Sequence, residues 1–454
     1  MTFNSINPYN GKEIAAYTEH SEKEISDILE KSRRTFESWR QVPIKERCKL
    51  LKNAAGLLKD NVDRYAETMT LEMGKPISES RGEIHKCAWV CEFYAENAER
   101  FLADELIETD ATESFVSYDP IGTVLAIMPW NFPFWQVFRF AAPTLAAGNT
   151  GLLKHASNVF GCAAHIEELF LEAGFPEGVF QNLIVHHDKT ETIIAHEAVK
   201  AVTLTGSERA GKAVGALAGG NLKKSVLELG GNNAFIVLED ADMGLAVKTG
   251  VTARMMNSGQ SCIAAKRFIL VGEAYDNFLP DFIKGVQALR KGDPLDESTE
   301  IGPLARKDLA DQLHEQMKKS IDQGAKLELG GHQENAFHEP TILSGVKPGM
   351  PAFDEETFGP LAAITRAEDE EEAFKLAANS KYGLGVTVFT RDIERVRRNI
   401  GKVPDGAFFV NELVKSDPRL PFGGTRNSGY GRELSREGIR EFVNKKTVYI
   451  NGER

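Results

Sequence analysis

Short apolar runs alternate with helical segments between residues 120 and 220, and this alternation constrains the fold more than any other feature of the chain. We expect strands at Thr123–Met128, Gly151–Lys154, Val179–Val185 and Val199–Thr205. Between them we expect helices at Trp135–Ala147, Phe160–Ala173, Lys189–His196 and Glu208–Ala218. Such alternation predicts an α/β domain in which helices cover both faces of a parallel sheet. A sheet of this kind binds ligands beyond the carboxyl ends of its strands.

A second alternating stretch begins near Asn233 and runs past residue 410, which predicts a second α/β domain. Two domains agree with a length of 454 residues, because a single core rarely extends over so long a chain. The expected limits are residues 1–97 and 121–230 for the first domain, 231–430 for the second, and 98–120 and 431–454 for a remainder outside both.

The N-terminal region is predicted to be helical. Ser21–Glu24 has the pattern of a capping box, which opens a helix. Longer helical regions are expected from about Ile44 to Met73 and from about Ile84 to Leu102. Met73–Pro76 contains glycine and proline, so it is expected to separate the two regions.

Composition excludes several classes of function. The net charge is −12 and the pI is near 5.5, which argues against a nucleic-acid or anionic-membrane surface. No apolar run approaches the roughly 18 residues of a membrane span, and the first residues lack a signal-peptide pattern. Five scattered cysteines predict a reducing, cytoplasmic location. Cys87 and Cys91 have no second Cys/His pair at ligand spacing, so no metal is predicted.

Two motifs point to nucleophilic chemistry. Cys262 ends the segment Asn257–Cys262, where small and polar residues follow one another around a glycine, as expected for a reactive thiol. Glu228 precedes a Gly-Gly turn and is a candidate base. Each has an alternative when considered alone, because most cysteines are small buried apolar residues and most glutamates are solvated.

Two further motifs suit a dinucleotide and an oxyanion. Gly206, Ser207 and Gly211 follow a predicted strand and open a helix, where backbone N–H groups bind a pyrophosphate. An ordinary strand–helix turn is the alternative. Asn131 lies in the segment Pro129–Pro133, and its amide can donate to a developing oxyanion. The alternative there is an asparagine turn beside a packed tryptophan.

In their order along the chain, these motifs and Phe353–Pro360 resemble the aldehyde dehydrogenase superfamily over essentially the whole length. The resemblance implies two doubly wound parallel-sheet domains and a small β arm. In that arm Ser114–Asp119 and Thr447–Ile450 pair and join subunits into a homodimer or dimer of dimers. Residues alone would leave both pieces as edge strands.

The resemblance also implies a nicotinamide cofactor. Lys154 would reach the adenosine ribose, and Ser157 stands where a glutamate would repel a 2′-phosphate, so NADP is expected, with NAD also accepted. Ser157 is alternatively a helix cap. Glu356 would hold the nicotinamide ribose, and Phe358 would pack near the ring. The expected cofactor-binding residues are Trp130, Lys154, Ser157, Gly206, Ser207, Gly211, Leu229, Glu356 and Phe358.

The implied chemistry has two steps. The Cys262 thiolate attacks the aldehyde carbon, Asn131 and the Cys262 N–H stabilise the oxyanion, and hydride transfer to the nicotinamide gives a thioester. Glu228 then activates the water that hydrolyses this thioester to the free acid.

The substrate is predicted from cationic residues near the thiol. Trp135 and Arg139 are one helical turn apart, so Arg139 is expected to clamp a distal carboxylate, with a structural salt bridge as the alternative. Arg419 is a second candidate, with a solvent-facing loop charge as its alternative. Some relatives carry another arginine where this chain has Met256. The expected substrate-binding residues are Trp135, Arg139, Ser261, Ser416 and Arg419.

The wider sequence resembles the succinate-semialdehyde dehydrogenase subgroup most. The leading prediction is therefore oxidation of succinate semialdehyde to succinate with NAD(P). One alternative is a broad aldehyde dehydrogenase for other semialdehydes or neutral aldehydes. Another is a catalytically silent binding or structural protein with the same fold, against which the intact Cys262, Glu228, Asn131 and Glu356 argue.

Overall fold

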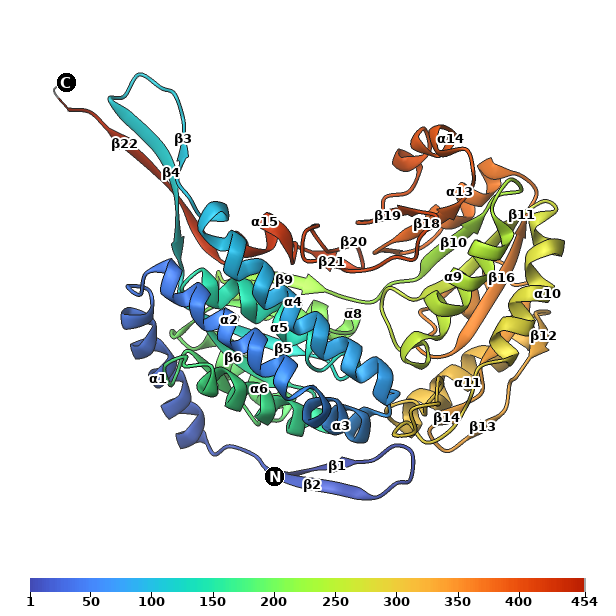
Figure 1. The fold of residues 1–454 in the computed structure, drawn as a ribbon, viewed down its shortest axis with the longest axis horizontal. Coiled ribbons are helices and arrows are strands. Elements are labelled where there is room, and N and C mark those ends of the chain that lie inside the picture. The colour runs from blue at the N-terminus through green and yellow to red at the C-terminus, as the bar shows by residue number, and fades with distance from the viewer. Residues whose placement is uncertain (453–454) are drawn as a thin grey trace.

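A parallel sheet forms the core of the half drawn in blue and green in Figure 1. Its strand order is β21-β9-β8-β5-β6-β7, and only the edge strand β21 is antiparallel to its neighbour. The strands are β5 (Thr123–Met128), β6 (Thr150–His155), β7 (Phe180–Asn182), β8 (Val199–Thr205), β9 (Lys224–Glu228) and β21 (Gly429–Tyr430). The predicted strand Val179–Val185 is shorter than expected, because pairing with β6 ends at Asn182. The other three predicted strands are confirmed.

Helices cover this sheet as predicted. Those inside the alternating stretch are α5 (Trp135–Ala146), α6 (Phe160–Glu172), α7 (Thr190–Ala195) and α8 (Glu208–Gly220). Those that precede it are α1 (Glu22–Trp39), α2 (Ile44–Asp60), α3 (Val62–Met73) and α4 (Ile77–Phe101). The capping box at Ser21 is confirmed, since its hydroxyl accepts from the Glu24 N–H and the Glu24 carboxylate accepts from the Ser21 N–H.

One predicted helix limit was wrong, and one predicted helical region is divided. The region from Ile44 to Met73 begins and ends as expected, but it is two helices, because Asn61 leaves the helical conformation at φ −113° and ψ 24°. The next helix begins at Ile77 instead of Ile84, directly after Pro76, a residue that suits the start of a helix. The predicted stop at Gly74 is confirmed, with a left-handed φ of 79°.

A second sheet lies in the half drawn in yellow and orange (Figure 1). Its order is β12-β15-β16-β11-β10-β18-β19, and only the edge strand β12 is antiparallel. Its strands are β10 (Asn233–Val237), β11 (Ala265–Val271), β12 (Lys326–Leu329), β15 (Thr341–Ser344), β16 (Leu361–Ala367), β18 (Val386–Phe389) and β19 (Phe408–Val410). Its helices are α9 (Met243–Met255), α10 (Ala274–Gln287), α11 (Lys307–Asp322), α12 (Pro351–Asp354), α13 (Glu370–Ala378) and α14 (Ile393–Arg397). Aromatic side chains from β10, β11, β18 and α10 pack against one another in its core.

A β arm projects from the first half and carries the C-terminal strand (Figure 1). Strand β4 (Glu113–Pro120) pairs antiparallel with β22 (Val443–Ile450) and with β3 (Glu105–Leu106). Val116 lies opposite Thr447, so the two predicted strand-like pieces pair as expected. At the other end of the chain, β1 (Thr2–Ile6) and β2 (Glu13–Thr18) form a hairpin.

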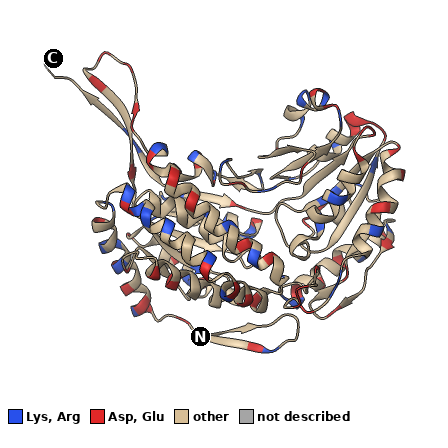
Figure 2. Cartoon of the chain, viewed as in Figure 1, with Lys and Arg blue, Asp and Glu red and all other residues tan. Residues whose placement is uncertain are grey.

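This computed structural model describes residues 1–452. Its remaining elements are short: β13 (Gln333–Glu334), β14 (Phe337–His338), β17 (Tyr382–Gly383), β20 (Thr425–Arg426) and α15 (Ser435–Ile439). Positive and negative side chains are interspersed over the helices of both halves (Figure 2). Among the helices of residues 1–452, none is both long and apolar enough to cross a bilayer.

Candidate active site

Two cavities meet at Cys262, which lies between the two sheets. The larger cavity has a volume of about 980 Å³ and the smaller one about 260 Å³. Cys262 and Gln136 line both cavities. A thiol in this position is in reach of two ligands that enter from different sides.

The loop that carries Cys262 has an unusual backbone. Asn257, Ser258 and Gly259 have φ values of 54°, 51° and 73°, a left-handed run that only the glycine adopts without strain. A Cβ on Gly259 would lie 2.4 Å from the Gly359 carbonyl oxygen. The buried Arg254 guanidinium donates to the carbonyls of Gly259 and Gly359, at 2.6 Å each, and so fixes the turn.

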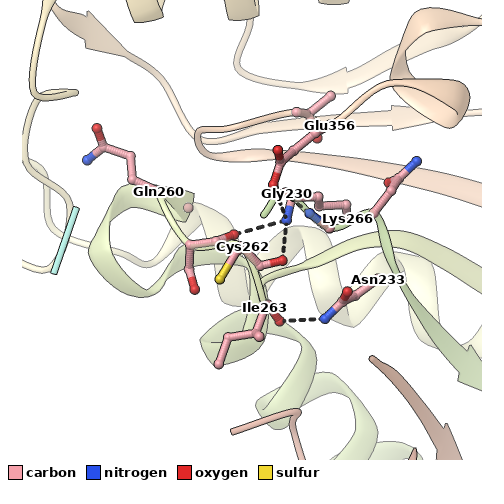
Figure 3. Close-up of polar contacts among 12 residues, drawn as sticks. Gly230, Asn233, Gln260, Cys262, Ile263, Lys266 and Glu356 are labelled. Carbon is pink, nitrogen blue, oxygen red and sulfur yellow. Dashed lines mark hydrogen bonds and ion pairs between the residues drawn. The ribbon is translucent and has the colours of Figure 1, made fainter. Parts of the chain in front are cut away.

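Lys266 contacts both the same loop and the carboxylate of Glu356 (Figure 3). Its ammonium donates to the carbonyl oxygens of Ser261 and Cys262 at 2.9 and 2.8 Å and lies 3.3 Å from Glu356 Oε1. Burial lowers the pKa of Lys266 to about 8, and the Glu356 carboxylate opposes that shift. The close approach requires glycine at position 230, where a Cβ would lie 2.2 Å from Glu356 Oε2.

The Cys262 thiol is half-buried. Burial raises its pKa to about 11, while the positive charges of Arg139 and Lys266 oppose that shift. Asn131 is buried on the adjacent wall, and its Nδ2 donates to the Gln260 carbonyl at 3.0 Å. A side-chain amide has two N–H groups, so the second one is left to donate toward a ligand at Cys262.

Glu228 is buried at the end of β9, and neither of its carboxylate oxygens has a hydrogen-bond partner among residues 1–452. Burial raises its pKa well above the usual range, Glu433 raises it further, and Arg139 opposes both. An unpartnered buried carboxyl with a raised pKa can hold a proton and exchange it with water, which suits a general base.

Arg139 was expected to bind the distal carboxylate of the substrate, but its charge is already paired within the protein. Its guanidinium is buried and forms an ion pair with Glu433, and it contacts the Thr205 hydroxyl at 3.3 Å. Thr205 is paired in register with Glu228, so Arg139 lies beside the two acids. The salt bridge left open as the alternative is what the structure shows, although Arg139 also lines the smaller cavity.

The larger cavity fits a dinucleotide. It opens at the carboxyl end of β8, where the Ser207 hydroxyl caps α8 and the turn at Gly206 leaves backbone N–H groups near the helix start. Trp130 and Phe358 face one another edge to face, with centroids 5.7 Å apart, at its wall. The expected cofactor-binding residues that line it are Trp130, Gly206, Ser207, Leu229, Glu356 and Phe358.

Three expected cofactor residues lie outside this lining. Gly211 is buried under Leu229, where a Cβ would come within 2.5 Å, so it allows α8 to pack closely on β9. Lys154 is the second-last residue of β6, which runs beside β5 toward the same edge of the sheet, and burial lowers the pKa of Lys154. Ser157 follows that strand and is exposed. No capping bond from a side chain occurs at the start of its short helix, Ser157–Val159, which counts against the capping alternative.

The smaller cavity gathers most of the expected substrate residues. Trp135 and Ser416 are buried in its wall, and the Ser261 hydroxyl is buried there without a partner. The N-terminus of α5, which carries Trp135, is fixed by Glu83 of α4, whose Oε1 accepts from the Phe134 and Trp135 N–H groups at 2.9 and 2.8 Å. Arg419 is not part of this wall: its side chain is 68% exposed and pairs with Asp417. The expectation of a second arginine contact there was wrong.

Several residues in the site were not found by sequence reasoning. Lys86 lines the smaller cavity, Glu433 pairs with Arg139, Gln136 lines both cavities, and Lys266 holds the nucleophile loop. Helical spacing offered one signal, since Lys86 is one turn after Glu83 on α4. Glu433 carries no local signal, because its partner is distant in the sequence.

Comparisons with known proteins agree on one family. Residues 1–448 match the model described as "Aldehyde dehydrogenase family". The "Probable succinate-semialdehyde dehydrogenase [NADP(+)]" of Synechocystis sp. is 48% identical over 453 residues, covering 99% of this chain and 100% of that protein. "Succinate semialdehyde dehydrogenase [NAD(P)+] Sad" of Escherichia coli is 45% identical, covering 98% and 97%. The crystal structure of succinic semialdehyde dehydrogenase from Streptococcus pyogenes in complex with NADP+ superimposes with a TM-score of 0.97 at 38% identity, covering 99% and 100%.

Proposed function

Because this chain belongs to the aldehyde dehydrogenase family, we propose that it oxidises succinate semialdehyde to succinate and uses NADP as hydride acceptor, with NAD also accepted. The observation that carries the proposal is the position of Cys262, in the walls of a dinucleotide-sized cavity and of a smaller one. The Cys262 thiol can then lie next to both the dinucleotide and the aldehyde.

In this proposal Cys262, Asn131 and Glu228 each have one chemical role. Cys262 loses its proton to solvent water and attacks the aldehyde carbon as thiolate, and the free N–H of the Asn131 amide donates to the oxyanion of the thiohemiacetal. A bound nicotinamide would supply the hydride acceptor, and loss of the hydride would leave a thioester on Cys262. Glu228 takes a proton from water as the water attacks that thioester, and the Cys262 sulfur leaves as thiolate.

The proposed cofactor rests on the larger cavity and on Ser157. Trp130, Gly206, Ser207 and Leu229 would form the wall and the pyrophosphate turn, with Glu356 and Phe358 at the nicotinamide end. Lys154 is the second-last residue of β6 and the uncharged Ser157 lies just beyond its carboxyl end, where a 2′-phosphate would meet a positive charge and no carboxylate. The name of the Synechocystis relative specifies NADP(+), and that of the Escherichia coli relative specifies NAD(P)+.

The proposal is tested by kcat/KM for succinate semialdehyde and for butanal, with NADP and with NAD, followed as absorbance of the reduced nicotinamide. We expect the carboxylated aldehyde with NADP to be the best pair. Equal kcat/KM for both aldehydes would make the chain a broad aldehyde dehydrogenase. No turnover of any aldehyde would leave a silent protein with the same fold.

We also propose that the β arm joins copies of the chain into a homodimer or dimer of dimers in the cytoplasm. Apolar side chains stay exposed on the arm of the single chain, with Leu106 79% and Tyr449 49% exposed. The five cysteines are free thiols, in keeping with a reducing compartment. Light scattering of the purified protein gives the mass that tests the assembly, and a monomeric mass would contradict it.

A further inference from the structure

The smaller cavity contains one cation whose charge is not compensated. Arg139 is paired with Glu433, Lys75 with Glu83, and Lys415 with Glu412. Among residues 1–452, no carboxylate forms an ion pair with Lys86, although its side chain is half-buried in the wall of the cavity. A buried charge without a counter-ion is costly, so a group that neutralises it is bound strongly.

The contacts of Lys86 leave it open toward a ligand. Its Nζ donates to Ser416 Oγ at 2.8 Å and lies 4.2 Å from the centroid of the Trp135 ring. An ammonium has three N–H groups, and this hydrogen bond uses one of them. Because Ser416 Oγ accepts from Lys86, its own hydrogen is left to donate. Lys86 and Ser416 together therefore offer donors to one anion.

Among the described residues of the cavity wall, no other side chain is better suited than Lys86 to bind an anion. Met256 and the aromatic rings of Phe132, Trp135 and Phe422 are uncharged. Glu79 accepts the Asn257 N–H at 2.7 Å, and burial raises its pKa to about 7, so its negative charge is weakened near neutral pH. Drawing Arg139 to a ligand would leave Glu433 as an unpaired buried carboxylate near Glu228.

We propose that Lys86, with Ser416, binds the distal carboxylate of the aldehyde and determines the selectivity of the enzyme, while Arg139 positions the acids Glu433 and Glu228. This inference rests on the proposed function and names the residue that selects its substrate class. The aldehyde carbon then lies at Cys262 and the carboxylate lies at the α4 wall of the same cavity.

The direct test is the kcat/KM of Lys86→Met for succinate semialdehyde and for butanal. Loss of a buried charged contact is expected to lower kcat/KM for the carboxylated aldehyde about thirty- to a thousandfold and to change that for butanal less than about threefold. Lys86→Arg retains a cation and is expected to restore part of the preference. Lys415→Met is the matched control, because this cavity lysine is half-exposed and already paired with Glu412.

A readout without turnover separates binding from chemistry. Succinate is expected to protect Cys262 from alkylation by iodoacetamide in the wild type and in Lys415→Met, and to fail to protect it in Lys86→Met. This measurement stands even where a variant is too slow to assay.

The pH dependence gives an independent signature. Burial lowers the pKa of Lys86 to about 8, Arg139 on α5 lowers it further, and Cys87, Glu83 and Asp417 oppose the shift. The ammonium is therefore lost above that pH, and the preference for succinate semialdehyde over butanal is expected to fall. Because both aldehydes use the same thiol, their ratio cancels the titration of Cys262. Lys86→Arg should abolish the fall of this ratio above about pH 8, whereas a change near pH 7 would come from Glu79 in the same cavity.

The outcomes separate the two claims. Equal losses on both aldehydes in Lys86→Met would make Lys86 structural and overturn the inference. A selective loss in Arg139→Met, with Lys86→Met unaffected, would overturn it in favour of the arginine clamp. A wild-type enzyme with no preference for the carboxylated aldehyde would instead contradict the proposed function.

Discussion

The two cavities that meet at Cys262 are built in different ways. The dinucleotide-sized cavity includes turns at strand ends, such as Gly206–Ser207 after β8 and Leu229–Gly230 after β9, together with side chains of α8 and α11. The smaller cavity is formed by side chains from α4, α5, the nucleophile loop and the segment 413–422. The shape of the larger cavity, on the cofactor side of Cys262, depends partly on backbone conformation. The smaller cavity, on the substrate side, depends on which side chains meet.

This difference explains how substrate preference can vary on a constant fold. A backbone turn admits few substitutions, because glycine is required where a Cβ would strike a neighbour, as at Gly230 against Glu356. A side-chain wall changes its charge with one substitution, as at Lys86. Changes on one side of Cys262 should therefore leave the selectivity of the other side unchanged, and this is the central claim of the account.

The largest effect is expected where the two sides share a residue. Cys262→Ala should lower kcat by more than about 10⁴-fold for every aldehyde and with both cofactors, because the covalent step is lost. Dinucleotide binding, measured by quenching of tryptophan fluorescence, should persist. Residual turnover confined to one aldehyde would show that a second nucleophile serves that cavity.

The second-largest effect on turnover is expected for Glu228→Gln. It should spare the first turnover, because Glu228 acts only after the hydride has left. The expected result is a burst of about one equivalent of reduced cofactor, followed by turnover slowed about 10²- to 10⁴-fold. In the wild type, the raised pKa of Glu228 should make hydrolysis faster as pH rises, since the base must lose its proton. The variant should lose that dependence. Disappearance of the burst itself would mean that Glu228 activates the thiol.

Ser157→Glu tests the cofactor side alone. A carboxylate there would face the 2′-phosphate, so the ratio of kcat/KM with NADP to that with NAD should fall about ten- to a hundredfold. The preference between succinate semialdehyde and butanal should not change. Ser157→Ala is the matched control, with an expected change of less than about threefold. An unchanged cofactor ratio in Ser157→Glu would remove this residue from the site.

Lys266→Met should have the smallest effect, and it probes the contact between the nucleophile loop and Glu356. Loss of the ammonium, which lies 3.3 Å from Glu356 Oε1, is expected to raise KM for NADP about five- to tenfold. Both aldehydes should be affected equally. The double variant with Glu356→Gln should raise KM no further than Glu356→Gln alone. Additive effects would show that Lys266 acts only on loop stability.

Much of the fold was predictable because its signals are local. Val199–Thr205 and Thr123–Met128 are apolar runs with clear ends, and the structure has both strands at the predicted residues. Ser21 and Gly74 delimit helices through bonds within a few residues. The break at Asn61 was missed, because a continuous apolar face hides a single residue that leaves the helical conformation.

The side-chain partners were less predictable. The arginine at position 139 is buried where expected, yet its charge is directed to Glu433 from the opposite end of the chain. Arg419 looked equivalent in sequence, but its neighbour Asp417 holds it at the surface. Lys86 had no visible role until the structure placed it against Trp135 and Ser416. Charge compensation is a tertiary property, so residue type and spacing do not determine it.

The most direct test of the central claim is kcat/KM for succinate semialdehyde and butanal, each with NADP and NAD, in the wild type, Ser157→Glu, Lys86→Met and the double variant. If the two sides act independently, the cofactor ratio will change only with Ser157→Glu and the aldehyde ratio only with Lys86→Met. The two changes in free energy will then add in the double variant to within about 0.5 kcal/mol. A coupling energy above about 1 kcal/mol, or a cofactor ratio that shifts in Lys86→Met, would contradict the account.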